Sequence, residues 1–319
     1  MEKLIKLYKE NLLVTNCPYC NSTKFKKHGK YKFTHRYKCK DCKRTFLPSS
    51  GTSIHYIHKK ELFIEYAEVL KKEGLSSVMK MSKRFNIAKL TSFDWRHKIF
   101  SSIPQQNILF KDEAFVGDIS FRFSQKGRRG LSKKENDINK RYFSRVLNTT
   151  DQNINFVRIA TVGNLNAEHL DRVLRKKIME SCKLLIPEKD AFLKFTKNNR
   201  IDKKVVHKDV SVYLKHRIVR YYQQLSSKIV NFINYELKGV STKYLQGYNN
   251  FFITKEMQIF DAMTTKYLCQ KFVWRIFTQM EETYKEFLDL HCEAKYSRPI
   301  KRSWKRTKLY NITQDNILY

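Results

Sequence analysis

Residues 155–187 read NFVRIATVGNLNAEHLDRVLRKKIMESCKLLIP, and the hydrophobic period changes twice along this stretch. Apolar and polar side chains alternate in residues 155–163, which predicts a strand. Residues 166–181 follow the helical period, with one apolar face and Asn166 as an N-cap. Residues 182–187 are again apolar and predict a second strand. A strand, a helix and a strand in this order predict a helical crossover within one sheet.

The flanking sequence extends this unit into a larger sheet. The element order is β-β-β-α-β-α-β-α, three antiparallel strands followed by parallel strands with helical crossovers, which is the ribonuclease-H-like (RNase H-like) arrangement. We therefore predict an α+β multidomain chain in which residues 108–252 form an RNase H-like mixed five-stranded sheet with flanking helices. The further predicted elements are strands 113–124, 142–151 and 203–209 and helices 189–199 and 213–237.

The charge of the chain indicates a polyanionic partner. The sequence has 64 Lys+Arg against 30 Asp+Glu, a net charge of +34. Coding bias in an AT-rich genome would raise the lysine count but would not make acids so scarce. An excess of this size favours nucleic acid, here double-stranded DNA, over a membrane surface.

Nothing in the hydropathy predicts a membrane segment. No apolar run approaches the roughly 20 residues that a membrane span needs. The N-terminal stretch MEKLIKLYKENLLV has charges inside its apolar residues, so we expect no signal peptide. We predict a cytoplasmic, nucleoid-associated protein with no membrane partner.

Four cysteines form a pattern typical of a zinc ribbon: Cys17 and Cys20, then Cys39 and Cys42. Each CxxC presents two thiolates from one turn, and two such turns can enclose a tetrahedral Zn²⁺. The alternatives are a redox dithiol or disulfides. Residues 1–50, the predicted ribbon, hold 13 Lys/Arg and 3 acids, so we expect this domain to face phosphate.

Residues 51–107 predict a helix-turn-helix. An apolar helical stripe begins near residue 59 and stops at Gly74, and two shorter helices flank residues 86–88. The last helix, about residues 89–100, would enter the major groove. A plain three-helix packing unit is the alternative. The side chains predicted to meet DNA are Lys89, Arg96 and Lys98, together with Thr91 and Ser92.

Acidic residues suggest a metal site at the predicted sheet. Asp118 lies in the middle of the first strand, and residues 182–192 end the fourth strand in Pro187, Glu188, Lys189 and Asp190. These two places are neighbours in an RNase H-like sheet. Two carboxylates there can bridge Mg²⁺ ions that activate a water or a 3′-hydroxyl. An ordinary solvent-facing strand acid is the alternative for Asp118.

A basic loop follows the first strand. In SQKGRRG, glycines let the backbone approach a strand beside three cations, Lys126, Arg128 and Arg129. These cations suit phosphate contact, and solvated side chains are the alternative.

The chain resembles bacterial insertion-sequence transposases that have an N-terminal zinc ribbon, a helix-turn-helix and a DDE-type catalytic domain. The resemblance covers about residues 15–255. The ribbon and the last motif are the most specific parts. The motifs that carry it are CPYC…YKCKDCKRTF, Gly51-Thr52, GLS…FNIAKLTSFDWRHKIF, SFRFSQKGRRG and KGVSTKYLQGYNNFF (238–252).

The resemblance implies metal-dependent DNA strand cleavage and transfer at terminal inverted repeats, by a protein that acts as a homo-oligomer. Asp118 matches the first catalytic aspartate. Pro187 stands where the second aspartate belongs, with Glu188 as a substitute ligand or a first-turn helix acid. The third position falls near Gln224, which offers a carbonyl oxygen and no charge. The resemblance therefore implies an impaired Mg²⁺ site.

Residues 253–319 predict a helical extension and a basic tail, in which residues 294–314 carry seven Lys/Arg and no acid. Two functions outside active transposition stay open. One is a non-catalytic DNA-binding protein derived from a transposase. The other is a ribosomal or transcription-associated zinc-ribbon protein, which would leave the RNase H-like half unexplained.

Overall fold

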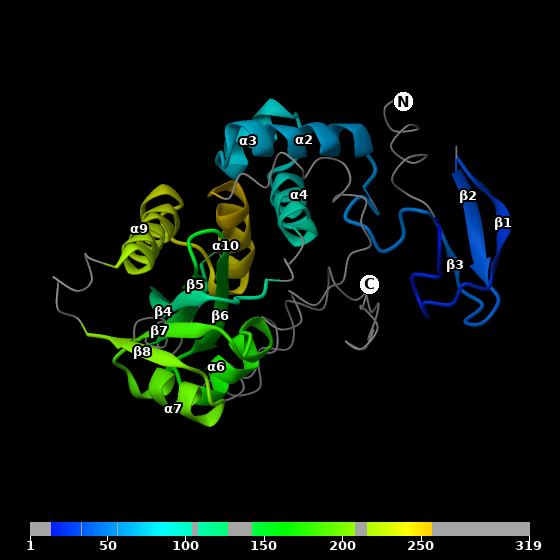
Figure 1. Cartoon of the computed structure of the whole chain (residues 1–319). Helices are drawn as coiled ribbons and strands as arrows, with labels where there is room; N and C mark the ends of the chain where they lie inside the picture. Colours follow the sequence, from blue (N-terminus) through cyan, green and yellow to red (C-terminus); the bar gives the residue numbers. More distant parts are fainter. Residues whose placement is uncertain are drawn as a thin grey trace, which may run out of the picture. The chain divides into compact units, whose positions relative to one another are not determined.

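The structure is a computed structural model in which the described residues fall into two compact units, residues 14–103 and 108–256 (Figure 1). Each unit is described by itself. Of the predicted extension, only residues 253–256 are described, and Arg128 and Arg129 also lie outside the described residues. The described ranges are 14–32, 34–55, 57–103, 108–126, 142–207 and 216–256.

The first unit begins with a three-stranded antiparallel sheet, within the residues that the sequence assigns to the ribbon. Its strands, in spatial order, are β1 (Phe25–Tyr31), β2 (Thr34–Cys39) and β3 (Thr45–Phe46). Rings of Phe25, Tyr37 and Phe46 gather on one side, with centroids 5.6 to 5.7 Å apart. The sequence did not indicate β3, because two residues are too few to show a period.

Three helices complete the first unit: α2 (Lys60–Glu73), α3 (Val78–Arg84) and α4 (Lys89–Ser102). Phe63 and Tyr66 of α2 pack edge-on against Trp95 of α4, at centroid distances of 5.4 and 5.6 Å. Gly74 ends α2 with a φ of +80°, a conformation that glycine adopts without strain. The predicted helices on either side of residues 86–88 are confirmed.

The second unit is built on a five-stranded mixed sheet, as the sequence predicts. The strand order is β6-β5-β4-β7-β8; β4, β5 and β6 pair antiparallel, and β7 pairs parallel with β4 and β8. The strands are β4 (Glu113–Arg122), β5 (Phe143–Thr150), β6 (Asn155–Val162), β7 (Lys183–Pro187) and β8 (Lys203–Val206).

Helices cover both faces of this sheet (Figure 1). Val116 points into the core beneath α6 (Ala167–Leu174) and α7 (Asp190–Asn198). Phe115, one residue earlier, packs with α9 (Arg217–Asn231) on the other face. This alternation follows from the strand period of two, so every residue of β4 can be assigned to one face.

Two predicted helices are shorter than the sequence indicates. The helix expected over 166–181 ends at Leu174, followed by a 3₁₀ turn, because a parallel bridge between Phe110 and Ile178 draws the chain into an extended form. The helix expected over 213–237 ends at Asn231 and continues as a π-helical turn, Phe232–Glu236. Residues 208–215 lie outside the described ranges.

A further helix, α10 (Thr242–Glu256), was not assigned from the sequence and packs beside the edge strand β6. The side-chain amide of Gln246 accepts from the Ile159 backbone N–H at 2.8 Å and donates to the Val157 carbonyl at 2.9 Å. One buried glutamine thus satisfies two outward backbone groups of β6, as a neighbouring strand would.

Candidate functional site

The four predicted ligand cysteines converge in the first unit. Their Sγ atoms all lie within 4.8 Å of one another, with 3.7 Å between Cys17 and Cys42 and 3.6 Å between Cys20 and Cys39. A tetrahedral Zn²⁺ with Zn–S bonds of about 2.3 Å requires S–S edges of about 3.8 Å. The four cysteines are free thiols, so the disulfide alternative does not hold. The cluster is compatible with structural zinc.

The thiols of the cluster differ in how readily they ionise. Burial raises the pKa of Cys17 to about 12. Burial also acts on Cys39, but hydrogen bonds from the backbone N–H groups of Cys42 and Asp41, together with those to the Cys20 and Cys42 side chains, outweigh it and lower its pKa to about 7. A bound divalent cation would stabilise all four thiolates together, which the peptide alone does not do.

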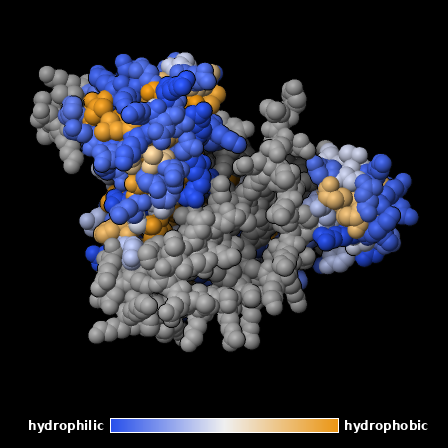
Figure 2. All heavy atoms as spheres, turned by 90° about the horizontal axis from the view of Figure 1, so that it is seen from below, coloured by the Kyte–Doolittle hydropathy of each residue, from blue (hydrophilic) through white to orange (hydrophobic). Residues whose placement is uncertain are grey.

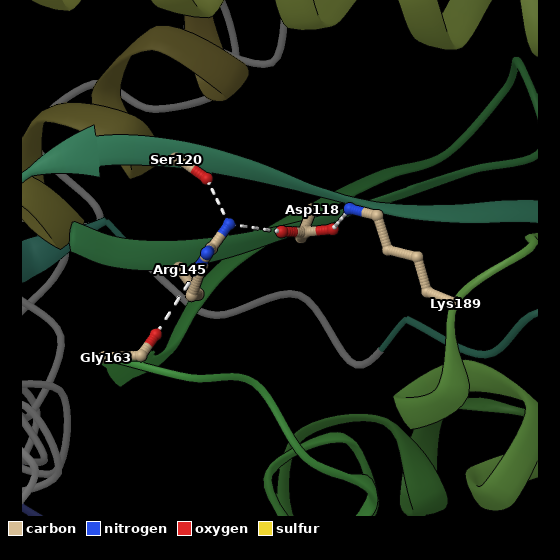
Figure 3. Close-up of polar contacts among 5 residues, drawn as sticks. All are labelled: Asp118, Ser120, Arg145, Gly163 and Lys189. Atoms are coloured by element: carbon tan, nitrogen blue, oxygen red, sulfur yellow. Dashed lines mark hydrogen bonds and ion pairs between the residues drawn. The ribbon is translucent and has the colours of Figure 1, made fainter.

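In the second unit, Asp118 is held by two cations (Figure 3). Its side chain is only 3% exposed. Lys189 Nζ lies 2.5 Å from Oδ1, and Arg145 Nη1 lies 3.3 Å from Oδ2. Both carboxylate oxygens therefore already face a positive charge of the chain itself.

The elements explain why these three side chains meet. Arg145 of β5 is the register partner of Ser120, and its guanidinium also donates to Ser120 Oγ at 2.5 Å and to the Gly163 carbonyl at 3.4 Å. Lys189 is the residue just before α7, where β7 has ended and the side chain can reach across to β4. The three side chains form what we call the Asp118 ion triad: Asp118, Arg145 and Lys189.

Gly117 fixes the face on which Asp118 lies. A Cβ at Gly117 would stand 2.3 Å from the hydroxyl oxygen of Tyr222 on α9, so a larger residue there would displace the Tyr222 side chain. Asp118, the next residue, points to the opposite face, toward α7.

The structure does not bring the other predicted catalytic residues to Asp118. Glu188 is exposed and pairs with His207, with 3.0 Å between Oε2 and Nδ1. Gln224 is exposed on α9, the helix that covers the face away from the Asp118 carboxylate. Among the described residues, no group of three or more His, Cys, Asp or Glu gathers around Asp118 as a metal site would require. Their catalytic roles stay predictions.

Lys126, predicted to contact phosphate, lies against a backbone turn, and its phosphate contact stays a prediction. Its Nζ donates to the carbonyls of Lys238 and Gly239 at 2.8 and 2.7 Å, and it lies 3.5 Å from the Leu237 carbonyl. Its charge is therefore already solvated by the turn that precedes α10.

A second contact joins the same two segments. The Ser124 backbone N–H donates to Thr242 Oγ1 at 2.9 Å, and the Thr242 N–H donates back to the Ser124 carbonyl at 2.8 Å. These hydrogen bonds join two sequence motifs that lie more than a hundred residues apart, SFRFSQKGRRG and KGVSTKYLQGYNNFF.

The predicted DNA-contacting residues of α4 have different environments. Lys89 is exposed at the first helical position. Arg96 is 3% exposed and donates to the Ser76 carbonyl, so in the free unit it packs inward. Lys98 donates to the His55 carbonyl at 3.3 Å, and burial lowers the pKa of its ammonium group. Of these three cations, only Lys89 is exposed.

Exposed cations that the sequence analysis did not single out lie on the preceding helix. Lys80 and Lys83 of α3 are exposed, close in sequence to the α4 N-terminus. Helical periodicity could have identified them, since the buried α3 residues Met81 and Ser82 leave these lysines outside.

The surface of the described residues is largely hydrophilic on the face drawn in Figure 2, with smaller separate apolar areas. No helix within the described ranges combines the length and the apolar character needed to cross a bilayer. The chain matches no protein-family model, and no curated protein matches it significantly.

Proposed function

We propose that this chain is a DNA-binding protein of the insertion-sequence transposase class, with a structural zinc ion and impaired strand cleavage and transfer. The observation that carries DNA binding is the net charge of +34. Counterions released from DNA phosphates by Lys and Arg supply most of the affinity in such complexes. Binding sites at terminal repeats and self-association on paired ends are parts of the same proposal.

The fold is consistent with this class. Strand order β6-β5-β4-β7-β8, with three antiparallel strands followed by two parallel ones, supports an RNase H-like assignment. The α3–α4 pair, joined by a turn at residues 85–88, supports a helix-turn-helix. The exposed lysines Lys80, Lys83 and Lys89 are the first candidates for contact with DNA in that unit.

The Asp118 ion triad supports the impaired chemistry. A Mg²⁺ ion at Asp118 would have to displace the Lys189 ammonium and the Arg145 guanidinium, and among the described residues no group of three or more His, Cys, Asp or Glu surrounds Asp118. Hard divalent ions need several anionic oxygens. This observation favours the second candidate as well, a non-catalytic DNA-binding protein derived from a transposase.

Two measurements test the proposal. The first is the affinity of the full chain for duplex DNA over a range of salt concentrations, where we expect a steep linear fall of log K with log salt. Binding that is indifferent to salt contradicts the proposal. A duplex carrying the inverted repeats that flank the gene, compared with a shuffled duplex of the same length, tests the expected target.

The second measurement is cleavage of end-containing DNA in the presence of Mg²⁺ or Mn²⁺. We expect little or no cleavage. Efficient cleavage that Asp118→Ala abolishes would show that the site is active and that the ion triad opens when DNA binds. Absent cleavage with intact binding favours the non-catalytic candidate.

A further inference from the structure

The three-stranded sheet of the first unit has two unlike faces (Figure 1). Phe25, Tyr37 and Phe46 lie on one face and pack in one cluster with the buried thiols of Cys17 and Cys39. Successive residues of a strand point to opposite faces, so the residues between these lie on the other face. That second face, which we call the cationic face, carries Lys26, Tyr31, Thr34, Arg36, Lys38 and Thr45.

The strand register brings the cations of this face close together. Lys26 of β1 is the register partner of Lys38 of β2, so the two side chains start about 5 Å apart. Arg36 lies two residues before Lys38, about 6.8 Å along the same strand. Its Nε donates to the His28 carbonyl at 3.1 Å, and its Nη2 lies 3.9 Å from the place that a Cβ of Gly29 would take. The Arg36 guanidinium is therefore held over the hairpin.

The cationic face has no countercharge of its own. Lys26 and Arg36 are exposed and Lys38 is half-buried, and within the described part of the chain no carboxylate pairs with any of the three. Like charges directly opposite each other on two strands destabilise the free sheet. An anion lying over the face turns this repulsion into attraction. The ring of Tyr31, which is 53% exposed, adds an apolar contact area at the end of the hairpin.

We infer that the cationic face of the ribbon sheet contacts the DNA phosphate backbone through Lys26, Arg36 and Lys38. The guanidinium offers forked donors that match phosphate oxygens, and each ammonium adds a point charge. The inference rests on the proposed function and deepens it, because it states which surface of the ribbon meets DNA. The composition of residues 1–50 indicated phosphate contact but did not distinguish the two faces of the sheet.

The test compares two double variants of the full, zinc-loaded chain. Lys26→Gln with Lys38→Gln changes the cationic face. Lys27→Gln with Lys30→Gln is the matched control, because both lysines are exposed and their register partners, Tyr37 and His35, place them on the opposite face. Both variants remove two positive charges from the same hairpin.

Zinc content and melting temperature verify that each variant folds. Loss of the Lys26–Lys38 pair should not lower the melting temperature, because it removes a repulsion between like charges. If that double variant does not fold, Lys26→Gln alone, compared with Lys27→Gln, keeps the test valid, since Lys26 is exposed.

The measurement is the affinity for duplex DNA across a salt series. We expect the variant of the cationic face to reduce the slope of log K against log salt by about two, one for each lost phosphate contact, and Lys26→Gln to reduce it by about one. The control should leave the slope unchanged. The remaining slope stays steep in every variant, because the other cations of the chain are kept.

Equal slopes in the two double variants, whether both are reduced or both unchanged, overturn the inference. The proposed function then still stands, provided that the unsubstituted chain binds DNA with a steep salt slope. Failure of the unsubstituted chain to bind DNA overturns both. A slope that the variant of the cationic face reduces only with duplex RNA of the same sequence would overturn DNA as the partner of this face.

Discussion

The two units differ in how potential anions are neutralised. In the first unit, four thiols meet within 4.8 Å and are compatible with an external cation such as Zn²⁺. In the second unit, Asp118 has its countercharges built into the chain, at 2.5 and 3.3 Å. A nearly buried carboxylate is therefore no sign of a metal site until its partners are known.

The largest expected effect is that of zinc removal on the first unit. We expect one zinc ion per chain, and we expect Cys39→Ser or a strong chelator to unfold the three-stranded sheet. Zinc contributes roughly 10–16 kcal/mol to the folding of small zinc domains, more than so short a sheet can replace. Zinc content by a chromogenic chelator and the NMR spectrum of residues 14–50 measure this.

The control for zinc removal is Cys182→Ser, which changes a buried thiol of the second unit. It should leave the zinc content unchanged. A chain that keeps its ribbon structure after complete removal of zinc would contradict the contrast between the units.

The next effect concerns Lys189. Lys189→Met leaves the Asp118 carboxylate, which is 3% exposed, with Arg145 alone. Removing one partner of a fully buried pair costs about 3–5 kcal/mol, but the Lys189 side chain is 47% exposed, so we expect about 1–2 kcal/mol. Urea denaturation of the chain, followed through the second unit, gives the free energy of unfolding.

Lys194→Met serves as control, since Lys194 is an exposed residue of α7. Combining Lys189→Met with Asp118→Asn should cost less than the sum of the two single changes, because the unpaired charge is gone. Added Mg²⁺ should not stabilise the unsubstituted chain. Equal losses of stability in Lys189→Met and Lys194→Met, or strong stabilisation by Mg²⁺, would show that Asp118 is not neutralised by the ion triad.

The smallest effect is a pH dependence in the first unit. Burial, with the charges of Lys60 and Lys98, lowers the pKa of His55 to about 4 from 6.5. The unfolded chain therefore binds the proton first as pH falls. The stability associated with neutral His55 is present above pH 6.5 and is lost progressively down to about pH 4.

His55→Gln should remove this loss of stability at acid pH. We expect its free energy of unfolding, relative to the unsubstituted chain, to rise by on the order of 1 kcal/mol between neutral and acid pH, because partial solvent contact weakens the full shift. Taking the difference between the two chains cancels the release of zinc by acid. A difference that is independent of pH would exclude His55 as the titrating group.

The sequence was sufficient to predict the features whose signal is local. The CxxC spacing located the thiol cluster, and the change from a period of two to one of 3.6 located the strands and helices of the mixed sheet. The ion triad was not predictable in this way, because Lys189 lies 71 residues from Asp118 and the strand register decides which residue after β7 reaches it. An acid was expected beside Asp118, and the fold places a lysine there.

The inward position of Arg96 could have been found. Ser92, Trp95, Arg96 and Ile99 are buried at spacings of three, four and seven residues along α4, which is the pattern of an inward helix face. The positive charge of Arg96 suggested contact with DNA, whereas the helical period places this residue on the buried face of α4. The short length of α6 had no such local signal, because its end depends on the bridge to Phe110.

The amide of Gln246 has a consequence for assembly. Open sheet edges invite strands from other molecules, and this glutamine occupies the hydrogen-bonding groups of Val157 and Ile159 that an incoming strand would use. A strand from another copy of the chain therefore cannot pair with these two groups of β6 while that side chain stays in place. Replacing Gln246 with leucine should leave the backbone groups of Val157 and Ile159 free to pair with a strand of another copy.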